Sequence, residues 1–430
     1  MFDDNKKNET SSESIETQTR YVATNYAKVV HGDCQCSEKK CNGQEISKTK
    51  SIRELLPVQQ SDNPQDRSFA KSGGRGRSSE FYTGIKQYEK EIRHIFEHQW
   101  LPVEHVSRLK KKGSFITLKF DTINVLVMRG NKGIQAYHNY CTHRGCRLVE
   151  EESGRKNKFL CKYHCWQFDS DGQLDAWNGT YLDSSFNPDE ASLKKIHTQI
   201  RHGIVFISLN STPTDIDEYL GDFAKFASVY DLESFVCAET RDYPVDCNWK
   251  LVLHNINESL HFPATHPSLH KIADYDDAGV YDVQGNIVCS YNRIRKGFNT
   301  VSMTGETSRE ALKGIPEEDK DIINWVTILP NLMFGFCADY ILMQWVWPQT
   351  ESSCLVRNHW LFHKNQVSKS DFSCEDVVNI WLRTNDEDWE ICERTQRGIE
   401  SRYWQPGFLS LDEEVIFKID QWIANQTDSE

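Results

Sequence analysis

The spacing of hydrophobic and polar residues divides this chain into four segments. Residues 1–75 are polar and rich in Ser, Thr, Glu, Asn and Lys, which predicts a disordered or loosely structured N-terminal tail. Apolar side chains recur at helical spacing in residues 76–99, so we predict a helical segment that packs on the C-terminal domain. Residues 100–212 contain short runs typical of an all-β domain, whereas residues 213–430 mix helical and strand patterns. The predicted fold class is therefore α+β, with two structured domains.

Individual runs set the positions of these elements. Segment 114–120 alternates apolar and polar residues, and segments 123–128 and 204–209 are β-rich and bounded by turn residues. In the C-terminal half, Asp412, Glu413 and Glu414 place negative charge in the first turn of a predicted helix. We predict C-terminal strands at 301–303, 326–328 and 354–362 and helices at 370–400 and 412–423.

Composition limits the class of protein. The 430 residues suffice for two cores, and no run of 18 apolar residues or N-terminal signal sequence is visible. The net charge of −13 argues against nucleic acids and anionic membranes as partners. Fourteen scattered cysteines in a long chain indicate a reducing compartment. We expect a cytoplasmic protein, and an organelle stroma or matrix stays open. For Cys34, Cys36 and Cys41, in the tail, we expect incidental thiols.

Four residues in the β-rich segment form a metal-ligand pattern. Cys141 and His143 read C-T-H, and Cys161 and His164 read C-K-Y-H. Two thiolates on one iron and two imidazoles on the other are the ligands of a Rieske [2Fe–2S] cluster. A zinc site is the alternative, but zinc fingers pair Cys with Cys and His with His. Because each half of this pattern carries one of each, we predict a [2Fe–2S] cluster that transfers single electrons.

A second pattern predicts a mononuclear iron site. His261 and His266 are five residues apart around Pro263, which we expect to mark the end of a helix. Two imidazoles and one carboxylate form the facial triad of non-heme Fe(II) oxygenases, which leaves positions open for O2. We predict Asp388 as the carboxylate, with Asp386 and Glu387 as alternatives from the same acidic run.

Glu258 precedes His261 by three residues and could lie on the same face. One hypothesis is that its carboxylate fixes the tautomer of an iron-binding imidazole. The other is that it bridges that imidazole to a cluster histidine and so gives electrons a short path. Both hypotheses require the same contact with His261, and they differ in what binds the far side of the carboxylate.

The two metal motifs together resemble the α subunit of Rieske non-heme iron oxygenases over residues 80–425. The resemblance rests on C-T-H-R-G, C-K-Y-H-C-W, N-W-K-L, N-E-S-L-H-F-P-A-T-H and E-D-W-E-I-C-E-R-T-Q-R-G-I-E-S-R, the last being most similar to the branch that oxidises quaternary ammonium compounds. It implies a Rieske domain, a helix-grip catalytic domain with a central antiparallel sheet, and head-to-tail trimers in which Glu258 couples iron in one subunit to a cluster in the next.

The resemblance and the motifs together predict an oxygenase. We expect it to hydroxylate choline, glycine betaine or carnitine with O2, using NAD(P)H electrons from a separate flavin or iron-sulfur reductase, because the chain has no convincing dinucleotide-binding motif. An aromatic-ring oxygenase and a non-catalytic Rieske electron carrier are the alternatives. A quaternary ammonium group is held by aromatic faces, and the predicted cage consists of Phe334, Phe336, Tyr340, Trp345 and Trp347.

Overall fold

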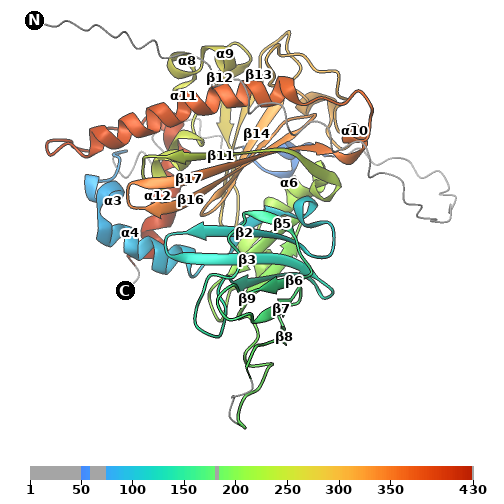
Figure 1. The fold of residues 1–430 in the computed structure, drawn as a ribbon. Helices are drawn as coiled ribbons and strands as arrows, with labels where there is room; N and C mark the ends of the chain where they lie inside the picture. Colours follow the sequence, from blue (N-terminus) through green and yellow to red (C-terminus); the bar gives the residue numbers. More distant parts are fainter. Residues whose placement is uncertain (1–49, 59–73, 180–183, 429–430) are drawn as a thin grey trace, which may run out of the picture. The chain divides into compact units, whose positions relative to one another are not determined.

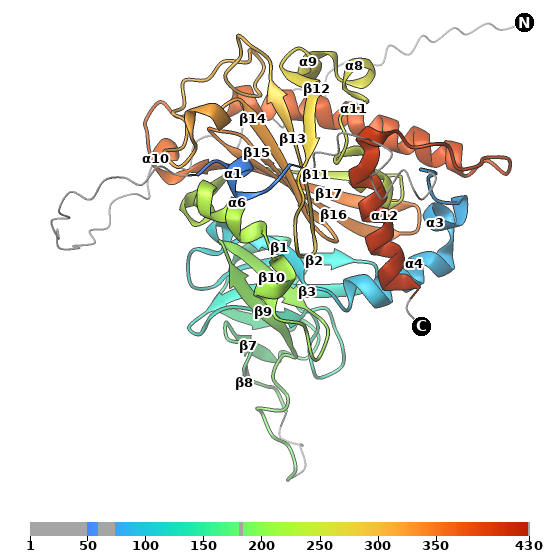
Figure 2. The same ribbon diagram turned by 180° about the vertical axis from the view of Figure 1, so that it is seen from behind.

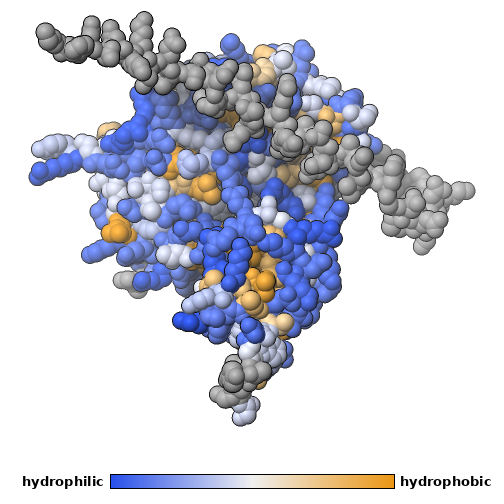
Figure 3. Space-filling model, viewed as in Figure 1, coloured by the Kyte–Doolittle hydropathy of each residue, from blue (hydrophilic) through white to orange (hydrophobic). Residues whose placement is uncertain are grey.

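The structure is a computed structural model that describes residues 50–58, 74–179 and 184–428. All of these belong to the second of two compact units, Thr49–Glu430. The predictions for most of the N-terminal tail, including Cys34, Cys36 and Cys41, lie outside the described residues. None of the described helices is long and apolar enough to cross a membrane. The face in Figure 3 is mostly hydrophilic, with its hydrophobic residues in small patches.

The N-terminal domain is built on an antiparallel sheet of seven strands, in the order β1-β10-β9-β4-β3-β2-β5. Figure 1 shows β2 and β3 of this sheet from one side, and Figure 2 shows β1 and β10 from the other. The runs predicted at 114–120, 123–128 and 204–209 form β2, β3 and β10, which confirms those three predictions. A second sheet, β6-β7-β8, completes the domain. Its strands are β1 (Leu101–His105), β2 (Ser114–Phe120), β3 (Ile123–Gly130), β4 (Gly133–His138), β5 (Ser153–Arg155), β6 (Lys158–Leu160), β7 (Gln167–Asp169), β8 (Leu174–Ala176), β9 (Lys195–Arg201) and β10 (Ile204–Ser208).

The C-terminal domain is built on a second antiparallel sheet of seven strands, in the order β11-β17-β16-β15-β14-β13-β12. All residues of β14 and β15 are buried, so both faces of the sheet are covered. The strands predicted at 326–328 and 354–362 lie in β14 and β17, but residues 301–303 form bends. The strands are β11 (Phe235–Val245), β12 (Ala273–Val280), β13 (Ile287–Ile294), β14 (Ile322–Ile328), β15 (Leu332–Phe336), β16 (Ile341–Thr350) and β17 (Ser353–His363).

Alternation along β14, β15 and β16 assigns neighbouring residues to opposite faces of this sheet. On one face, Trp325 and Met333 belong to a hydrophobic cluster that includes residues of the long helix α11 (Glu375–Ile399). On the other face, Phe334 and Trp345 belong to a cluster that includes strands β1 and β10 of the N-terminal domain. The sheet thus separates a helix side from a domain-interface side.

The helices cover the C-terminal sheet and its edges. Helix α11 crosses the sheet in Figure 1, and α12 (Glu414–Thr427), seen from behind in Figure 2, packs beside α4 (Ile85–Glu91) and β13. Segment 76–99 forms α3 (Ser79–Thr83), α4 and the π-helix Ile92–Phe96, and it contacts α11 and α12. The other α-helices among the described residues are α1 (Ile52–Leu55), α5 (Ile216–Leu220), α6 (Phe223–Tyr230), α7 (Trp249–Asn255), α8 (Phe262–Thr265), α9 (Pro267–His270) and α10 (Lys364–Val367).

Candidate functional site

Two loops of matching conformation carry the four predicted cluster ligands. Cys141 begins the loop after β4, and its carbonyl accepts a hydrogen bond from the Gly145 N–H at 2.8 Å. Cys161 begins the loop after β6, and its carbonyl accepts from the Cys165 N–H at 3.0 Å. Gly145 and Cys165 both have positive φ, at 73° and 60°, which turns each chain back on itself. Each loop therefore presents one cysteine and one histidine from a tight turn.

The sulfur atoms lie inside the domain and the imidazoles lie toward its surface. Cys141 and Cys161 are buried and their thiols interact, whereas His143 is exposed and its ring centroid lies 4.7 Å from that of His164. Burial raises the pKa of Cys161, but the backbone N–H groups of Tyr163 and His164, together with the thiols of Cys141 and Cys146, hold it below its usual range. Burial and the neighbouring Cys161 instead raise the pKa of Cys141 to about 11, so in the absence of iron one thiolate is favoured over two. Donors aimed at the sulfur stabilise a thiolate, the form that binds iron. Two buried thiols and two imidazoles toward the surface fit the ligands of a Rieske cluster.

Three side chains of the C-terminal domain bring their ligand atoms together. His261 Nε2 lies 3.1 Å from His266 Nε2, and Asp388 Oδ1 lies 2.8 Å from His266 Nε2 and 3.4 Å from His261 Nε2. With metal–ligand bonds of about 2.1 Å, adjacent octahedral positions are separated by about 3.0 Å and opposite ones by about 4.2 Å. All three separations match adjacent positions, so the geometry is that of a facial triad. Among the described residues, this is the one group of three or more such ligands within 4.8 Å of one another.

The other nitrogen of each imidazole is held by a glutamate. His261 Nδ1 contacts Glu258 Oε1, and His266 Nδ1 lies 2.8 Å from Glu387 Oε2. Glu387 was an alternative to Asp388 as the metal ligand, but its carboxylate lies on the far side of His266. Glu387 thus orients an imidazole, a role that the sequence reasoning did not assign to it.

The electrostatics of the triad suit a cation. Burial lowers the pKa of His261, but hydrogen bonds with Asp388 and Glu258 reverse this and raise it to about 9. Burial raises the pKa of Asp388, and the bonds to both histidines nevertheless hold it below its usual range. The site therefore favours positive charge between the two imidazoles and the carboxylate, and a divalent metal ion supplies that charge.

The local structure around the histidines differs from the expected one. Helix α7 ends at Asn255, and residues 256–261 form a non-helical connection, with turns at 256–257 and 260–261, in which Glu258 contacts His261. We expected Pro263 to mark the end of a helix, and this was wrong. Pro263 lies in the first turn of α8, where a missing backbone N–H breaks no helical hydrogen bond. His261 and His266 flank this four-residue helix as its N-cap and C-cap. A single short turn therefore sets their separation.

A cavity of about 260 Å³ lies beside the triad. Its inner wall comes from the helix side of the sheet, through Trp325, Met333 and Gln344, and from α11, through Trp381. The two indoles form an edge-to-face pair with centroids 5.9 Å apart. Phe262, Tyr275 and Tyr291 supply further aromatic surface.

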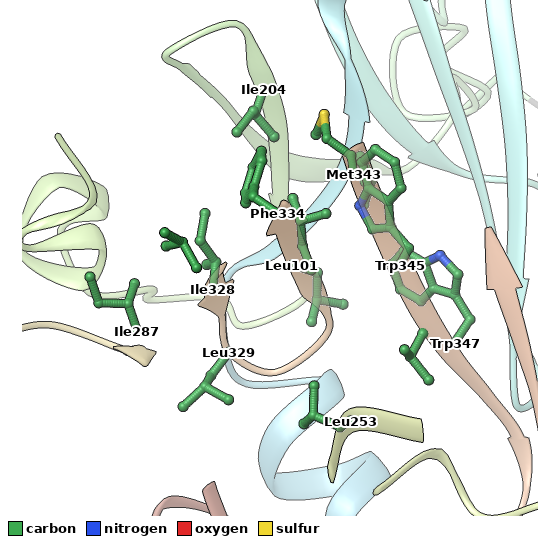
Figure 4. Close-up of a cluster of buried hydrophobic side chains, with 14 of the residues drawn as sticks. Leu101, Ile204, Leu253, Ile287, Ile328, Leu329, Phe334, Met343, Trp345 and Trp347 are labelled. Atoms are coloured by element: carbon green, nitrogen blue, oxygen red, sulfur yellow. The ribbon is translucent and has the colours of Figure 1, made fainter. Parts of the chain in front are cut away.

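The five residues of the predicted cage do not line this cavity. Phe334, Trp345 and Trp347 lie in the hydrophobic cluster of Figure 4, on the domain-interface face of the sheet. The Trp345 indole donates to the Pro102 carbonyl at 2.9 Å, and Trp347 stacks on Phe120. Phe336 stacks with Phe334 on that same face, and Tyr340 packs behind Trp381, where its hydroxyl donates to the Val301 carbonyl. The prediction was wrong because it ignored the alternation of the strands.

Comparison with known proteins agrees with both sites. Residues 99–182 match the Rieske [2Fe–2S] domain, and residues 232–429 match the catalytic domain of ring-hydroxylating α subunits. The glycine betaine monooxygenase oxygenase subunit of Pseudomonas aeruginosa is 31% identical over 359 residues, which cover 76% of this chain and 83% of the relative. The chain belongs to the Rieske oxygenase α-subunit family. It is thus a Rieske-type non-heme iron oxygenase, with a [2Fe–2S] cluster and a mononuclear iron as its cofactors.

Two further relatives belong to the same branch. The chloroplastic choline monooxygenase of Atriplex hortensis is 23% identical over 80% of this chain and 76% of its own length. The crystal structure of a quaternary ammonium Rieske monooxygenase in complex with L-carnitine superposes with a TM-score of 0.69. It is 22% identical and covers 82% of this chain and 96% of its own, which shows a shared fold.

Proposed function

We propose that this oxygenase hydroxylates a small quaternary ammonium compound of the choline, glycine betaine or carnitine type. The observation that carries the proposal is the aromatic cavity beside the triad. Trp325 donates its N–H to Asn292 Oδ1 and Trp381 donates to the Tyr340 hydroxyl, each at 2.8 Å. Because both polar atoms bond within the protein, these indoles offer ring surface to the cavity. Ring faces attract a cation that cannot donate hydrogen bonds.

The overall reaction follows from the donor sets. When bound, the cluster supplies single electrons and the iron supplies the position where O2 is activated. One oxygen atom enters a substrate C–H bond, and the other leaves as water with two electrons and two protons. Hydroxylation of a carbon next to nitrogen yields a product that collapses to an aldehyde and a demethylated amine. Hydroxylation of a choline carbinol yields an aldehyde hydrate.

The residues around the triad have separate tasks in this scheme. His261, His266 and Asp388 would hold the iron, while Glu258 and Glu387 fix the orientation of the imidazoles. The cavity walls position the substrate and exclude bulk water from the reacting carbon. Phe262 and Leu269 are buried and contribute to that exclusion.

Electron delivery is proposed to cross between subunits. His143 is exposed, and exposed apolar side chains of Tyr140, Leu160 and Tyr163 lie on or beside the cluster loops, a surface suited to docking. In a homotrimer this surface would meet Glu258 of a second copy, whose carboxylate would bridge a cluster histidine and His261. A separate flavin or iron-sulfur reductase would supply the electrons from NAD(P)H.

Substrate-dependent oxygen uptake with a suitable reductase tests this function. We expect uptake and an oxygenated product, identified by mass, with at least one of choline, glycine betaine and carnitine. A set of aromatic carboxylic acids is the control for the ring-hydroxylating alternative. Uptake with an aromatic acid and none with any trimethylammonium compound would refute the proposal.

A further inference from the structure

The charged side chains that line the cavity beside the triad are acidic. Among the described residues that line it, none is Lys or Arg, whereas Glu258, Asp276, Asp388, Asp412 and Glu414 are acidic. Glycine betaine and carnitine carry a carboxylate in addition to the quaternary nitrogen, but choline does not. The charge of the lining therefore bears on which of these three substrates the site accepts. This inference rests on the proposed function.

The cations that pack near the cavity are already paired. Arg53 lies over the Tyr291 ring but pairs with Asp319 at 3.5 Å, and Lys418 pairs with Glu414 at 3.5 Å. On the neighbouring strand β13 and just beyond it, Arg293 pairs with Asp277 and Asp321, and Arg295 pairs with Asp274. Each guanidinium or ammonium would have to leave a carboxylate of the protein to meet one on a substrate.

The amide donors of the inner wall are also engaged. Asn292 Nδ2 donates to Ser259 Oγ and to the Asp274 carbonyl, so both of its hydrogens are in use. Asn257 Nδ2 donates to the Leu253 carbonyl, and Gln344 Nε2 donates to Asn385 Oδ1. The other donors of the lining are neutral groups, such as those of Asn255, Ser290 and Tyr291. A carboxylate entering this cavity would therefore lose its hydration without meeting a cation, which is costly for a charged group.

Acidic side chains at the solvent-exposed opening of the cavity further disfavour a carboxylate. Asp276 and Asp412 line the cavity and are exposed. A divalent ion in the triad brings two positive charges, which Asp388 and Glu258 balance, and Glu414 has its lysine. The net charge that remains is that of the two exposed aspartates. They attract a cation and repel the carboxylate of a zwitterion.

We propose that the site selects a quaternary ammonium substrate that bears no carboxylate, such as a trimethylammonium alcohol. The cationic nitrogen lies against the Trp325 and Trp381 pair, and the rest of the molecule carries no negative charge. Glycine betaine and carnitine are poor ligands, although relatives with these substrates belong to the same branch.

Binding measured by calorimetry, without reductant, tests this with the iron-loaded and cluster-loaded protein. The probes are choline, glycine betaine and carbamoylmethyl-trimethylammonium, the amide that matches glycine betaine in shape and lacks its negative charge. We expect choline and the amide to bind at least about tenfold more tightly than glycine betaine. Equal or tighter binding of glycine betaine or carnitine would overturn the inference and leave the proposed function intact. Failure of every trimethylammonium probe to bind and to stimulate oxygen uptake would overturn both.

Variants at the mouth isolate the charge effect. Ala278 is exposed and lines the cavity, so Ala278→Lys adds a cation where the surface tolerates it. This variant should move the preference toward glycine betaine by about tenfold. Asp276→Asn with Asp412→Asn should weaken choline binding a few-fold and reduce its dependence on salt. The control is Asp371→Asn, an exposed acid outside the lining, which should change neither. An unchanged preference in Ala278→Lys and in the double variant would contradict the argument from charge.

Discussion

Replacing Glu258 with Gln separates the two roles that its carboxylate could have. Oε1 contacts His261 Nδ1, and Oε2 accepts the Leu260 N–H at 2.6 Å. An amide has one oxygen for these two donors, and its NH2 group faces whichever donor is left. Losing one charge-assisted bond in this mostly buried site costs about 2 kcal/mol, or about a 30-fold loss of iron affinity. Because the side chain changes little in volume, we expect the fold and the cluster to be retained.

Glu387→Gln is the matched control for that substitution. Glu387 binds the outer nitrogen of the second iron histidine at 2.8 Å and is also held by Arg383. Its side chain is more exposed, at 25% against 15% for Glu258, so its loss should cost less iron affinity, about tenfold. If both glutamates only orient imidazoles, saturating iron restores both variants.

A single-turnover assay distinguishes orientation from electron transfer. Each variant is loaded with iron until occupancy equals that of the wild type, and the reduced cluster is then mixed with O2 and substrate. We expect the absorbance of the oxidised cluster to return at least tenfold more slowly in Glu258→Gln, while Glu387→Gln reacts at close to the wild-type rate. Cluster oxidation at the wild-type rate in iron-saturated Glu258→Gln would refute the bridging role and leave only the orienting one.

Four other substitutions test the two sites, the contact between domains and the pH dependence of stability. His261→Ala should abolish oxygenation and leave the cluster spectrum unchanged, and loss of the cluster in this variant would contradict the assignment of separate sites. Trp381→Leu should weaken binding of the quaternary ammonium substrate about 2- to 30-fold in calorimetry, the range of a cation–π contact. Trp345→Phe, on the opposite face, should leave this affinity unchanged and instead lower the melting temperature, because it loses the bond to Pro102. Burial lowers the pKa of His105 from 6.5 to about 4, so the stability it contributes is complete above about pH 6.5 and is lost as pH falls toward about 4. The free energy of unfolding, measured by chemical denaturation at each pH, should therefore fall by up to about 3 kcal/mol across that interval. In His105→Asn the same free energy should depend less steeply on pH.

The sequence was most informative where chemistry depends on residue type and short spacing. Asp388 could be singled out because two histidines already required a carboxylate, and the helix predicted around it exists as α11. The position of Glu387 behind His266 could not be derived, because it depends on how a helix far along the chain packs on α8. The contact between Glu258 and His261 was expected from helical spacing, but a non-helical connection produces it.

The failed aromatic cage had a signal that could have corrected it. Met333 and Gln344 pair across β15 and β16 and line the cavity, whereas Phe334 pairs with Met343 on the opposite face. Side chains alternate between the two faces of a strand, so one residue known to line the cavity assigns every second residue of its strand to the same face. This rule would have replaced Phe334 and Trp345 by their neighbours Met333 and Gln344 in the prediction. Trp325 and Trp381 would still have required the register of β14 and the position of α11, which are tertiary information.

The two-faced sheet also bears on how this enzyme can diverge. Residues that line the cavity beside the triad and residues that pack against the Rieske domain alternate along the same strands, yet they occupy separate environments. A substitution at Met333 or Gln344 can reshape the substrate cavity while Phe334 and Trp345, one position away, keep the domains joined. Selection can therefore explore new substrates through one set of positions without disturbing electron supply through the other. That independence offers a physical reason why one architecture serves oxygenases with different substrates.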